Sequence, residues 1–139
     1  MVEIKVLLEK GIKMPTKAHK SDAGYDIYAP ESFGVAPKNS WTIDTGVHMV
    51  IPEGYVGFLK SKSGLNVKHG LTGEGVVDAG YTGSIQVKLY NDSNAPYIFD
   101  KGDKVIQIVI LPIPETKLVQ VDSLEETERG NNGFGSSGR

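Results

Sequence analysis

Apolar and polar residues alternate along several short stretches of the chain, which is the pattern of β-strands with one buried face. In the longest alternation, the side chains expected on the buried face occupy six successive odd positions: Trp41, Ile43, Thr45, Val47, Met49 and Ile51. Residues 85–89 repeat this pattern, whereas residues 105–111 form an apolar run broken only by Gln107, which predicts a strand buried on both faces. Further short strands are expected at residues 2–8, 25–29, 55–59, 76–77 and 118–121.

Glycine and proline are spread along the chain, with seventeen Gly and seven Pro among 139 residues. Each interior Gly costs a helix about 1 kcal/mol and each Pro about 3 kcal/mol, so residues 63–68 are expected to form one helical turn at most. Short strands joined by turns favour a single all-β domain, a sandwich or jelly roll. Residues 130–139 hold four Gly, two Asn and two Ser, which cannot form a core. We therefore expect a folded body at residues 1–128 and a flexible arm at residues 129–139.

The charge balance narrows the class of partner. Fifteen Lys and Arg against seventeen Asp and Glu leave a net charge of -2, so nothing favours a protein that coats nucleic acid or an anionic membrane. The chain has no Cys, which removes disulfides and thiolate chemistry. Residues 1–10 contain two Glu and fit neither a signal peptide nor a membrane span. A soluble, cytoplasmic protein is expected.

Two segments carry candidate polar chemistry. Residues 75–83, GVVDAGYTG, predict a hairpin that holds Asp78 and Tyr81 near its tip, although a turn-forming Asp and a Tyr covering the sheet explain this segment equally simply. Residues 59–65, LKSKSGL, offer the hydroxyl, ammonium and backbone donors that a phosphate needs, and a solvated basic loop would look the same.

Gln107 and the C-terminal residues add two further candidates. An amide inside an apolar strand must find hydrogen-bond partners or cost about 1–3 kcal/mol; neighbouring backbone, a subunit contact or a ligand would each satisfy Gln107. In the tail, Phe134 among glycines is suited to stacking on a base, and Arg129 to binding phosphate. A disordered end is the simpler alternative for this segment alone.

Other chemistries are disfavoured by the residues present. The three His are isolated without metal-ligand spacing, and no GxSxG segment presents a nucleophilic serine. Carboxylates with a hard divalent cation fit the inventory best.

Five segments, taken together and in order, closely resemble the five ordered motifs of the trimeric dUTPase family. They are AGYDIYA at 23–29, SKSGL at 61–65, GVVDAGYTG at 75–83, GDKVIQIVI at 102–110 and RGNNGFGSSG at 129–138. The resemblance implies an all-β jelly-roll subunit and a homotrimer with three active sites between subunits. One subunit would supply the hairpin, a second the metal and phosphate motifs, and a third its exchanged C-terminal arm.

The resemblance also implies hydrolysis of dUTP to dUMP and diphosphate, which limits uracil incorporation into DNA and supplies dUMP for dTMP synthesis. Asp78 is similar to the general base that activates water for attack on the α-phosphorus, and Tyr81 to the ring beneath deoxyribose. The hairpin backbone from Gly75 through Val77 would pair with uracil and exclude a 5-methyl group. Asp26 is similar to the residue that holds the cofactor Mg²⁺ through water.

The remaining implied contacts concern phosphate and base. The residues that are similar to the family's phosphate contacts are Lys62, Ser63, Gly64 and Gln107 of the body and Arg129, Ser136 and Ser137 of the arm. Phe134, beside Gly135, would stack on uracil. This sequence departs from the family at Lys62, where Arg is usual, which implies a weaker grip on phosphate or on the neighbouring subunit, and at Asn132, where Gly is common.

Two other functions stay open. A non-catalytic regulator would bind a partner protein, still unidentified, under the control of nucleotide. A deaminase acting on dCTP shares the fold, but the uracil-type hairpin and the Phe-containing arm favour the hydrolase.

Overall fold

The computed structural model describes every residue except Ser136 and Arg139, and the described chain is almost entirely β-structure. Its elements, in order, are β1 (Lys5–Leu8), β2 (Gly24–Tyr28), β3 (Phe33–Val35), β4 (Ser40–Asp44), β5 (Val47–Val50), β6 (Tyr55–Lys60), α1 (Ser63–His69), β7 (Leu71–Val77), β8 (Gln86–Asn91), β9 (Tyr97–Phe99) and β10 (Lys104–Pro112). The expected all-β class is confirmed. Within the described residues, no helix is long and apolar enough to span a membrane.

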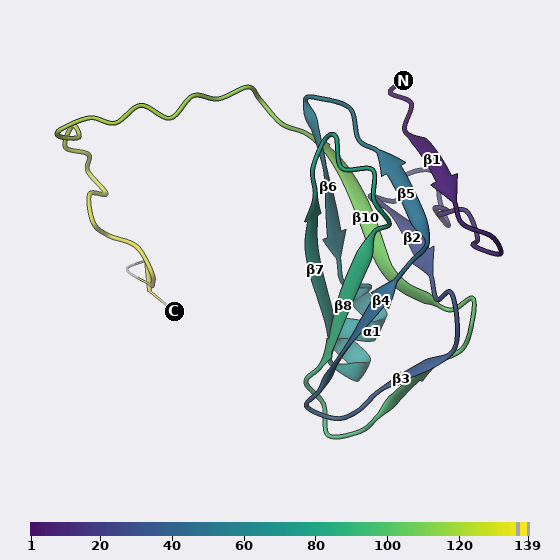
Figure 1. The fold of residues 1–139 in the computed structure, drawn as a ribbon. Coiled ribbons are helices and arrows are strands. Elements are labelled where there is room, and N and C mark those ends of the chain that lie inside the picture. The colour runs from purple at the N-terminus through teal and green to yellow at the C-terminus, as the bar shows by residue number, and fades with distance from the viewer. Residues whose placement is uncertain (136, 139) are drawn as a thin grey trace.

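One curled six-stranded sheet, in the order β2-β10-β6-β7-β8-β4, forms the body, and the pairs β1-β5 and β3-β9 pack against it (Figure 1). All the named strands pair antiparallel, so the polypeptide folds back and forth into a jelly-roll body. The core contains the inward residues of nearly every strand, among them Ile27, Val35, Ile43, Val47, Leu71, Val87, Phe99, Ile106 and Ile108. The apolar run at residues 105–111 is therefore a central strand, as predicted, but only its first half is buried on both faces: Val109 and Ile110 are half-buried and Leu111 is exposed.

The expected single strand at residues 41–51 is divided in two, which corrects the prediction. Strand β4 ends at Asp44 and β5 begins at Val47, with Gly46 between them at a φ of 69°. The N–H of Gly46 is 3.0 Å from the hydroxyl of Ser84 instead of joining a ladder. The alternation continues through the break, so it hides the change of sheet.

Helix formation also exceeds the expectation. Helix α1 has seven residues where one turn was expected, and Gly70, at a φ of 68°, ends it in the left-handed conformation that glycine adopts without strain. Strands β3 and β9 have three residues each, too few for an alternation to predict.

The strand expected at residues 118–121 does not form within the described chain. Leu118 is 98% exposed, and this segment extends away from the body (Figure 1). A strand needs a neighbour that accepts its backbone hydrogen bonds, and the folded body offers none to this segment.

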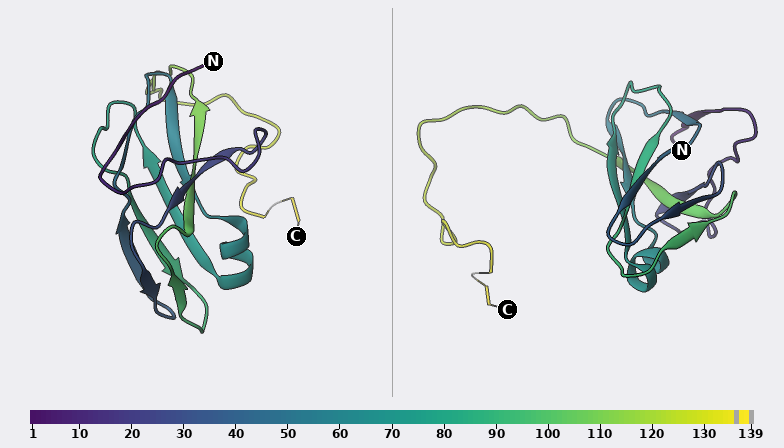
Figure 2. Two further views of the ribbon diagram at one scale, coloured as in Figure 1. Left: turned by 90° about the vertical axis from the view of Figure 1, so that its right-hand side faces the viewer. Right: turned by 60° about the horizontal axis from the view of Figure 1, so that its bottom comes forward.

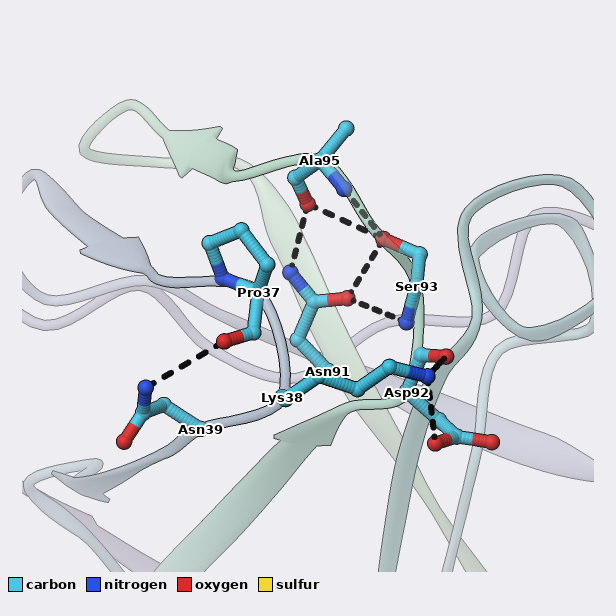
Figure 3. Close-up of polar contacts among 7 residues, drawn as sticks. All are labelled: Pro37, Lys38, Asn39, Asn91, Asp92, Ser93 and Ala95. Atoms are coloured by element: carbon cyan, nitrogen blue, oxygen red, sulfur yellow. Dashed lines mark hydrogen bonds and ion pairs between the residues drawn. The ribbon is translucent and has the colours of Figure 1, made fainter.

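A buried polar network holds the end of α1. Asn91 is 1% exposed, and its amide donates to the carbonyl of Val35. The amide also donates to the carbonyl of Ala95, and Oδ1 accepts from the N–H and hydroxyl of Ser93 (Figure 3). The next N–H, that of Asp92, donates to the carbonyl of Gly70 at 2.9 Å. The network therefore fixes the C-terminal end of α1, whose first residues belong to the candidate site.

Candidate active site

Three adjacent strands bring the first group of predicted residues together. Gln107 of the central strand β10 is paired with Asp26 of β2 on one side and with Lys60 of β6 on the other. The segment that follows Lys60 therefore begins beside Asp26. We refer to Asp26, Lys62, Ser63, Gly64, Lys104 and Gln107 as the Asp26 cluster.

Asp26 is the electrostatic centre of this cluster. Its side chain is buried, with the residue 3% exposed, and one carboxylate oxygen accepts a hydrogen bond from the ammonium of Lys62. The other oxygen lies 3.2 Å from the ammonium of Lys104. A buried carboxylate needs such partners, because burying an unpaired charge costs several kcal/mol.

Lys104 was missed by the sequence analysis. A bulge between Lys104 and Ile106 shifts the register of β10 against β2, so that Lys104 opposes Tyr28 while Gln107 opposes Asp26. Positions 28 and 26 share a face of β2, and the bulge therefore puts both β10 residues on that face. Strict alternation would place residues 104 and 107 on opposite faces, so no pattern in the sequence indicates this contact.

Gln107 holds the loop that precedes α1. Its side-chain amide donates to the carbonyl of Ser61 at 3.1 Å, which is the backbone partner considered among the alternatives. A Cβ at Gly24 would lie 2.4 Å from Oε1 of Gln107, so glycine at this position makes the room that the amide needs. The hydroxyl of Ser61 in turn bonds both backbone groups of Gly73 in β7.

The start of α1 is open to solvent and surrounded by basic groups. Ser63 and Gly64 are exposed, and Lys62 is the residue before the first turn, where it provides no side-chain cap. A hollow of about 280 Å³ lies beside them and is lined by Lys62, Gly64, Leu65, Lys68, His69, Tyr97 and Lys104. Three lysines around exposed hydroxyl and backbone groups make an environment suited to phosphate.

The second group of predicted residues lies in and after β7. Gly75 is in the strand, where a Cβ would be 2.9 Å from a methyl carbon of Leu59, and Val77 is the buried last residue. Residues 78–85, which we call the Asp78 loop, then lead to β8 and carry the exposed Asp78 and Tyr81. The segment is thus a connection between two sheet strands, as the hairpin prediction requires.

The conformation of the Asp78 loop is set by its own hydrogen bonds. The N–H of Tyr81 donates to the carbonyl of Asp78 at 3.2 Å, and the phenol donates to the carbonyl of Ser84 at 2.8 Å. The Tyr81 ring therefore folds over Gly83, where a Cβ would lie 2.5 Å from the phenol oxygen. A side chain at position 83 would therefore displace the Tyr81 ring from this position.

The Asp26 cluster and the Asp78 loop lie apart within one chain. Gln107, Lys60 and Glu74 are in register across β10, β6 and β7, whereas Asp78 follows β7, four residues after Glu74. Figure 1 shows α1 at one end of the sheet and the connection from β7 to β8 at the other. Four strand residues correspond to roughly 13 Å along the sheet, and the three strand spacings from β7 to β2 add roughly 14 Å across it, so one chain does not bring Asp26 and Asp78 together.

The predicted arm residues also lie apart from the body. Residues 114–135 extend away from the sheet, as the right-hand view of Figure 2 shows. Arg129 bonds only locally, its Nε donating to the carbonyl of Asn132 at 2.6 Å, and Phe134 and Ser137 are exposed. Gly135 has a φ of 96°, which suits glycine alone. Ser136 lies outside the described residues.

The metal-binding capacity of the described chain is limited to outer contacts. No group of three His, Cys, Asp or Glu is gathered among the described residues. Asp26 is a single carboxylate beside a phosphate-type environment, and Mg²⁺ is commonly held by one or two carboxylates with its waters and substrate phosphates. The residues present therefore fit a hydrated cation brought by a triphosphate.

Comparison with known proteins assigns the family. A family model described as dUTPase matches residues 10–138. The chain belongs to the dUTPase family. The recognised motifs and the expected class of nucleotide hydrolase are thereby confirmed.

Individual dUTPases are similar over nearly the whole chain. The deoxyuridine 5'-triphosphate nucleotidohydrolase of Leifsonia xyli subsp. xyli is 43% identical over 130 residues, which are 91% of this chain and 86% of that protein. The dUTPase of Staphylococcus bacteriophage 80alpha, solved with dUPNHPP, superimposes with a TM-score of 0.92 at 36% identity, covering 100% of both chains. That phage dUTPase is described as controlling the transfer of virulence genes.

A third dUTPase is relevant to the metal. A variant of the enzyme from phage phi11 of S. aureus matches with a TM-score of 0.82 at 33% identity, covering 90% of this chain and 100% of that one. Its structure is described as revealing the coordination of a structural Mg(II) ion.

Proposed function

We propose that this dUTPase hydrolyses dUTP to dUMP and diphosphate with Mg²⁺, as a homotrimer whose sites lie between subunits. The observation that carries the proposal is the separation of the Asp26 cluster from the Asp78 loop, both along β7 and across the sheet. A nucleoside triphosphate has to contact both, so the phosphate residues of one subunit must meet the loop of another. A closed ring of identical subunits satisfies this requirement three times over.

The arm completes this arrangement. Residues 1–128 act as the folded body, and residues 129–139 as an arm that closes over a site on another subunit. Arg129 and Ser137, with Ser136, would bind the outer phosphates, and Phe134 would stack on uracil beside the flexible Gly135. The extended course of residues 114–135 supports this assignment, because these residues lie away from the body of their own subunit.

The body residues divide the chemistry between base, sugar and phosphate. The backbone from Gly75 through Val77 would pair with the uracil edge and leave no space for a methyl group. Tyr81, folded over Gly83, would carry the deoxyribose, where a 2'-hydroxyl would clash. Asp78 would accept a proton from the attacking water as it adds to the α-phosphorus, since the exposed carboxylate is free to act as a base.

The Asp26 cluster would receive the triphosphate. Lys62, Ser63 and Gly64 offer an ammonium, a hydroxyl and backbone N–H groups, and Gln107 keeps that loop in place through Ser61. Asp26 would accept hydrogen bonds from the water shell of Mg²⁺. When bound, the cation neutralises charge on the phosphates and on the leaving diphosphate. By removing dUTP and forming dUMP, the enzyme would limit uracil in DNA and supply dTMP synthesis.

The direct test measures diphosphate release with Mg²⁺ and each deoxynucleotide in turn. We expect turnover of dUTP and little of dTTP, dCTP or UTP. Equal turnover of dTTP would overturn the assigned exclusion of the methyl group, and ammonia release from dCTP would indicate a deaminase. The mass of the protein in solution, measured in the same buffer, should be that of three chains.

A second role as a nucleotide-controlled regulator is favoured by one observation, the description of the phage 80alpha dUTPase as controlling gene transfer. A partner would be captured differently with and without dUTP. A pull-down from the native host with wild-type protein in both states tests this role, and an identical set of captured proteins in the two states would contradict it.

A further inference from the structure

His48 lies in strand β5, outside every segment that the motifs assign to the site, and both nitrogens of its ring are engaged. Nδ1 lies 2.8 Å from the carbonyl oxygen of Thr82, and Nε2 lies 3.1 Å from a carboxylate oxygen of Glu9. Thr82 belongs to the Asp78 loop, and Glu9 follows β1. The ring therefore bridges the N-terminal segment and the loop that carries Asp78 and Tyr81.

Both partners of this bridge are acceptors, which determines the protonation state that it needs. A neutral imidazole has one N–H and can donate to one acceptor, whereas an imidazolium donates from both nitrogens. If the neutral ring keeps its proton on Nδ1 for Thr82, the lone pair on Nε2 faces the carboxylate of Glu9. The complete bridge therefore exists only with a protonated His48.

The charges around the ring favour that state. The Thr82 carbonyl and then the Glu9 carboxylate raise the pKa of His48 above its ordinary 6.5, with a smaller contribution from Asp44, and desolvation opposes them. On β1, Leu7 pairs with His48, and Lys5 lies two residues before Leu7. Lys5 lines the same shallow hollow as His48 and Thr82 and is its basic residue. Two carboxylates against one ammonium leave the balance in favour of the imidazolium.

The other contacts of the Asp78 loop lie near its end, so the bond to Thr82 is the one that holds the loop next to Tyr81. The Ser84 hydroxyl donates to the carboxylate of Asp44, and the Thr45 hydroxyl donates to the carbonyl of Ile85, the last residue of the loop, at 2.6 Å. These contacts hold the end of the loop that leads into β8. His48 holds the loop next to Tyr81, and the backbone N–H of Glu9, bonded to the carbonyl of Gly46 at 3.0 Å, anchors the bridge to the body.

We propose that His48 is a positioning residue, which in its protonated form ties Thr82 to Glu9 and so holds Tyr81 in place for the nucleoside. The proposal rests on the proposed function in that Tyr81 is taken to carry the deoxyribose. Because the folded-state pKa is raised, the bridge is complete below the ordinary pKa of histidine and is lost as pH rises through the raised value. Nucleoside binding should therefore weaken over that pH range.

Four variants separate the bridge from general stability. His48→Val removes both hydrogen bonds and keeps a strand-forming residue. His48→Asn places an amide N–H close to the position of Nδ1 and retains the bond to Thr82. Glu9→Gln provides a side chain that donates to a neutral ring, so the bridge no longer needs the second proton. His19→Gln is the matched control, since His19 pairs with Asp22 on the exposed surface.

The experiment measures KM and kcat for dUTP between pH 5.5 and 8.5 for wild type and all four variants. At pH 6 we expect His48→Val to raise KM about three- to tenfold, the effect of losing the one hydrogen bond that reaches the Asp78 loop, with a smaller change in kcat. The ratio to wild type should fall as pH rises, because the neutral ring keeps at most one of the two bonds. His48→Asn, which keeps only the bond to Thr82, should have a KM between those of wild type and His48→Val at pH 6 and show no pH dependence. Glu9→Gln should remove the pH dependence, and His19→Gln should match wild type throughout.

A ratio of one at pH 6, or a ratio that does not change with pH, would overturn the proposal. NMR titration provides the readout that does not depend on catalysis: the His48 ring should titrate above 6.5, and the amide signals of Tyr81 and Thr82 should move with the same midpoint. Amide signals that ignore the His48 titration would overturn the bridge. A shared midpoint in a protein that does not hydrolyse dUTP would leave the bridge standing and reject the proposed function alone.

Discussion

The Asp26 cluster and the Asp78 loop are built in opposite ways, although both are assigned to one reaction. The cluster is assembled inside a single chain: a buried carboxylate holds two ammonium groups, and Gln107 fixes the neighbouring loop to the central strand. The Asp78 loop is exposed and stabilised mainly by bonds to its own backbone and to β5. One region is preformed before substrate arrives, and the other presents its chemistry outward to a neighbouring subunit.

This difference indicates where mutations act. A change in the cluster removes an interaction that the folded chain uses, so it should alter stability as well as binding. A change at the exposed carboxylate of Asp78 should alter the reaction while leaving the fold intact. The two regions are therefore distinguished by measuring both activity and stability for a variant in each region.

The largest effect is expected for Asp78→Asn. The amide keeps the shape of the side chain and cannot accept the proton from water, so kcat should fall about 10²- to 10⁴-fold. Binding of dUMP and the melting temperature should stay close to wild type, because Asp78 is exposed. Steady-state kinetics and calorimetric titration measure the two quantities. A variant with full kcat would remove Asp78 from its role as the base.

A mixing experiment sharpens the comparison between the regions. Asp78→Asn and Asp26→Asn, each inactive alone, are unfolded together and refolded. If each site joins the cluster of one subunit to the loop of another, random assembly gives about one quarter intact sites. Activity should reappear to that extent, whereas sites formed within single chains would give none.

How far the sequence predicts these regions depends on the range of the interactions. Alternation predicted β8, and a continuous apolar run predicted β10, because both patterns are local and can be seen in successive residues. The break at Gly46 was hidden, since the alternation carries on while the strand changes partner. Three-residue strands contain too little pattern, and α1 forms where glycine suggested one turn because its end is held by the Asn91 network.

For the candidate site, the sequence motifs indicated which residues take part, but only the structure showed which of them contact one another. The contact of Lys104 with Asp26 depends on a bulge in β10, and no residue type in the sequence announces that irregularity. His48 and Glu9 are 39 residues apart and meet only because β1 pairs with β5. The strand expected at residues 118–121 has an apolar pattern, but no strand of the body lies beside it, so the segment stays exposed.

The arm provides the next largest effect. A chain that ends at Arg129 should fold and assemble like wild type, since residues 130–135 extend away from the body. Its kcat/KM for dUTP should fall about 10²-fold, because a lid that positions and encloses the substrate is lost. Kinetics and light scattering measure activity and assembly. Unchanged activity would refute the arm, and replacing Phe134 alone with Ala should reproduce part of the loss.

Stability is the third way to separate the regions. Asp26→Asn leaves two ammonium groups facing a neutral amide, and we expect a loss of about 1–3 kcal/mol in the free energy of unfolding at pH 7. Asp92→Asn is the matched control, since Asp92 pairs with Lys38 at the surface and should change stability by less than about 0.5 kcal/mol. Urea denaturation measures both. Equal losses of unfolding free energy in the two variants would mean that the buried carboxylate of Asp26 contributes no more to stability than the exposed one of Asp92.

The smallest effect is expected for Lys62→Arg, which restores the residue usual in the family. The single ammonium of Lys62 is bonded to Asp26 and must be shared when a phosphate binds, because it is one compact charge. A guanidinium has a planar fork and can donate to the carboxylate and to a phosphate oxygen together. The KM for dUTP should therefore fall about two- to threefold with kcat unchanged. Lys68→Arg, in the same hollow but outside the motif, should change neither value. If both variants behave alike, Lys62 serves the fold through Asp26 and adds no phosphate contact of its own.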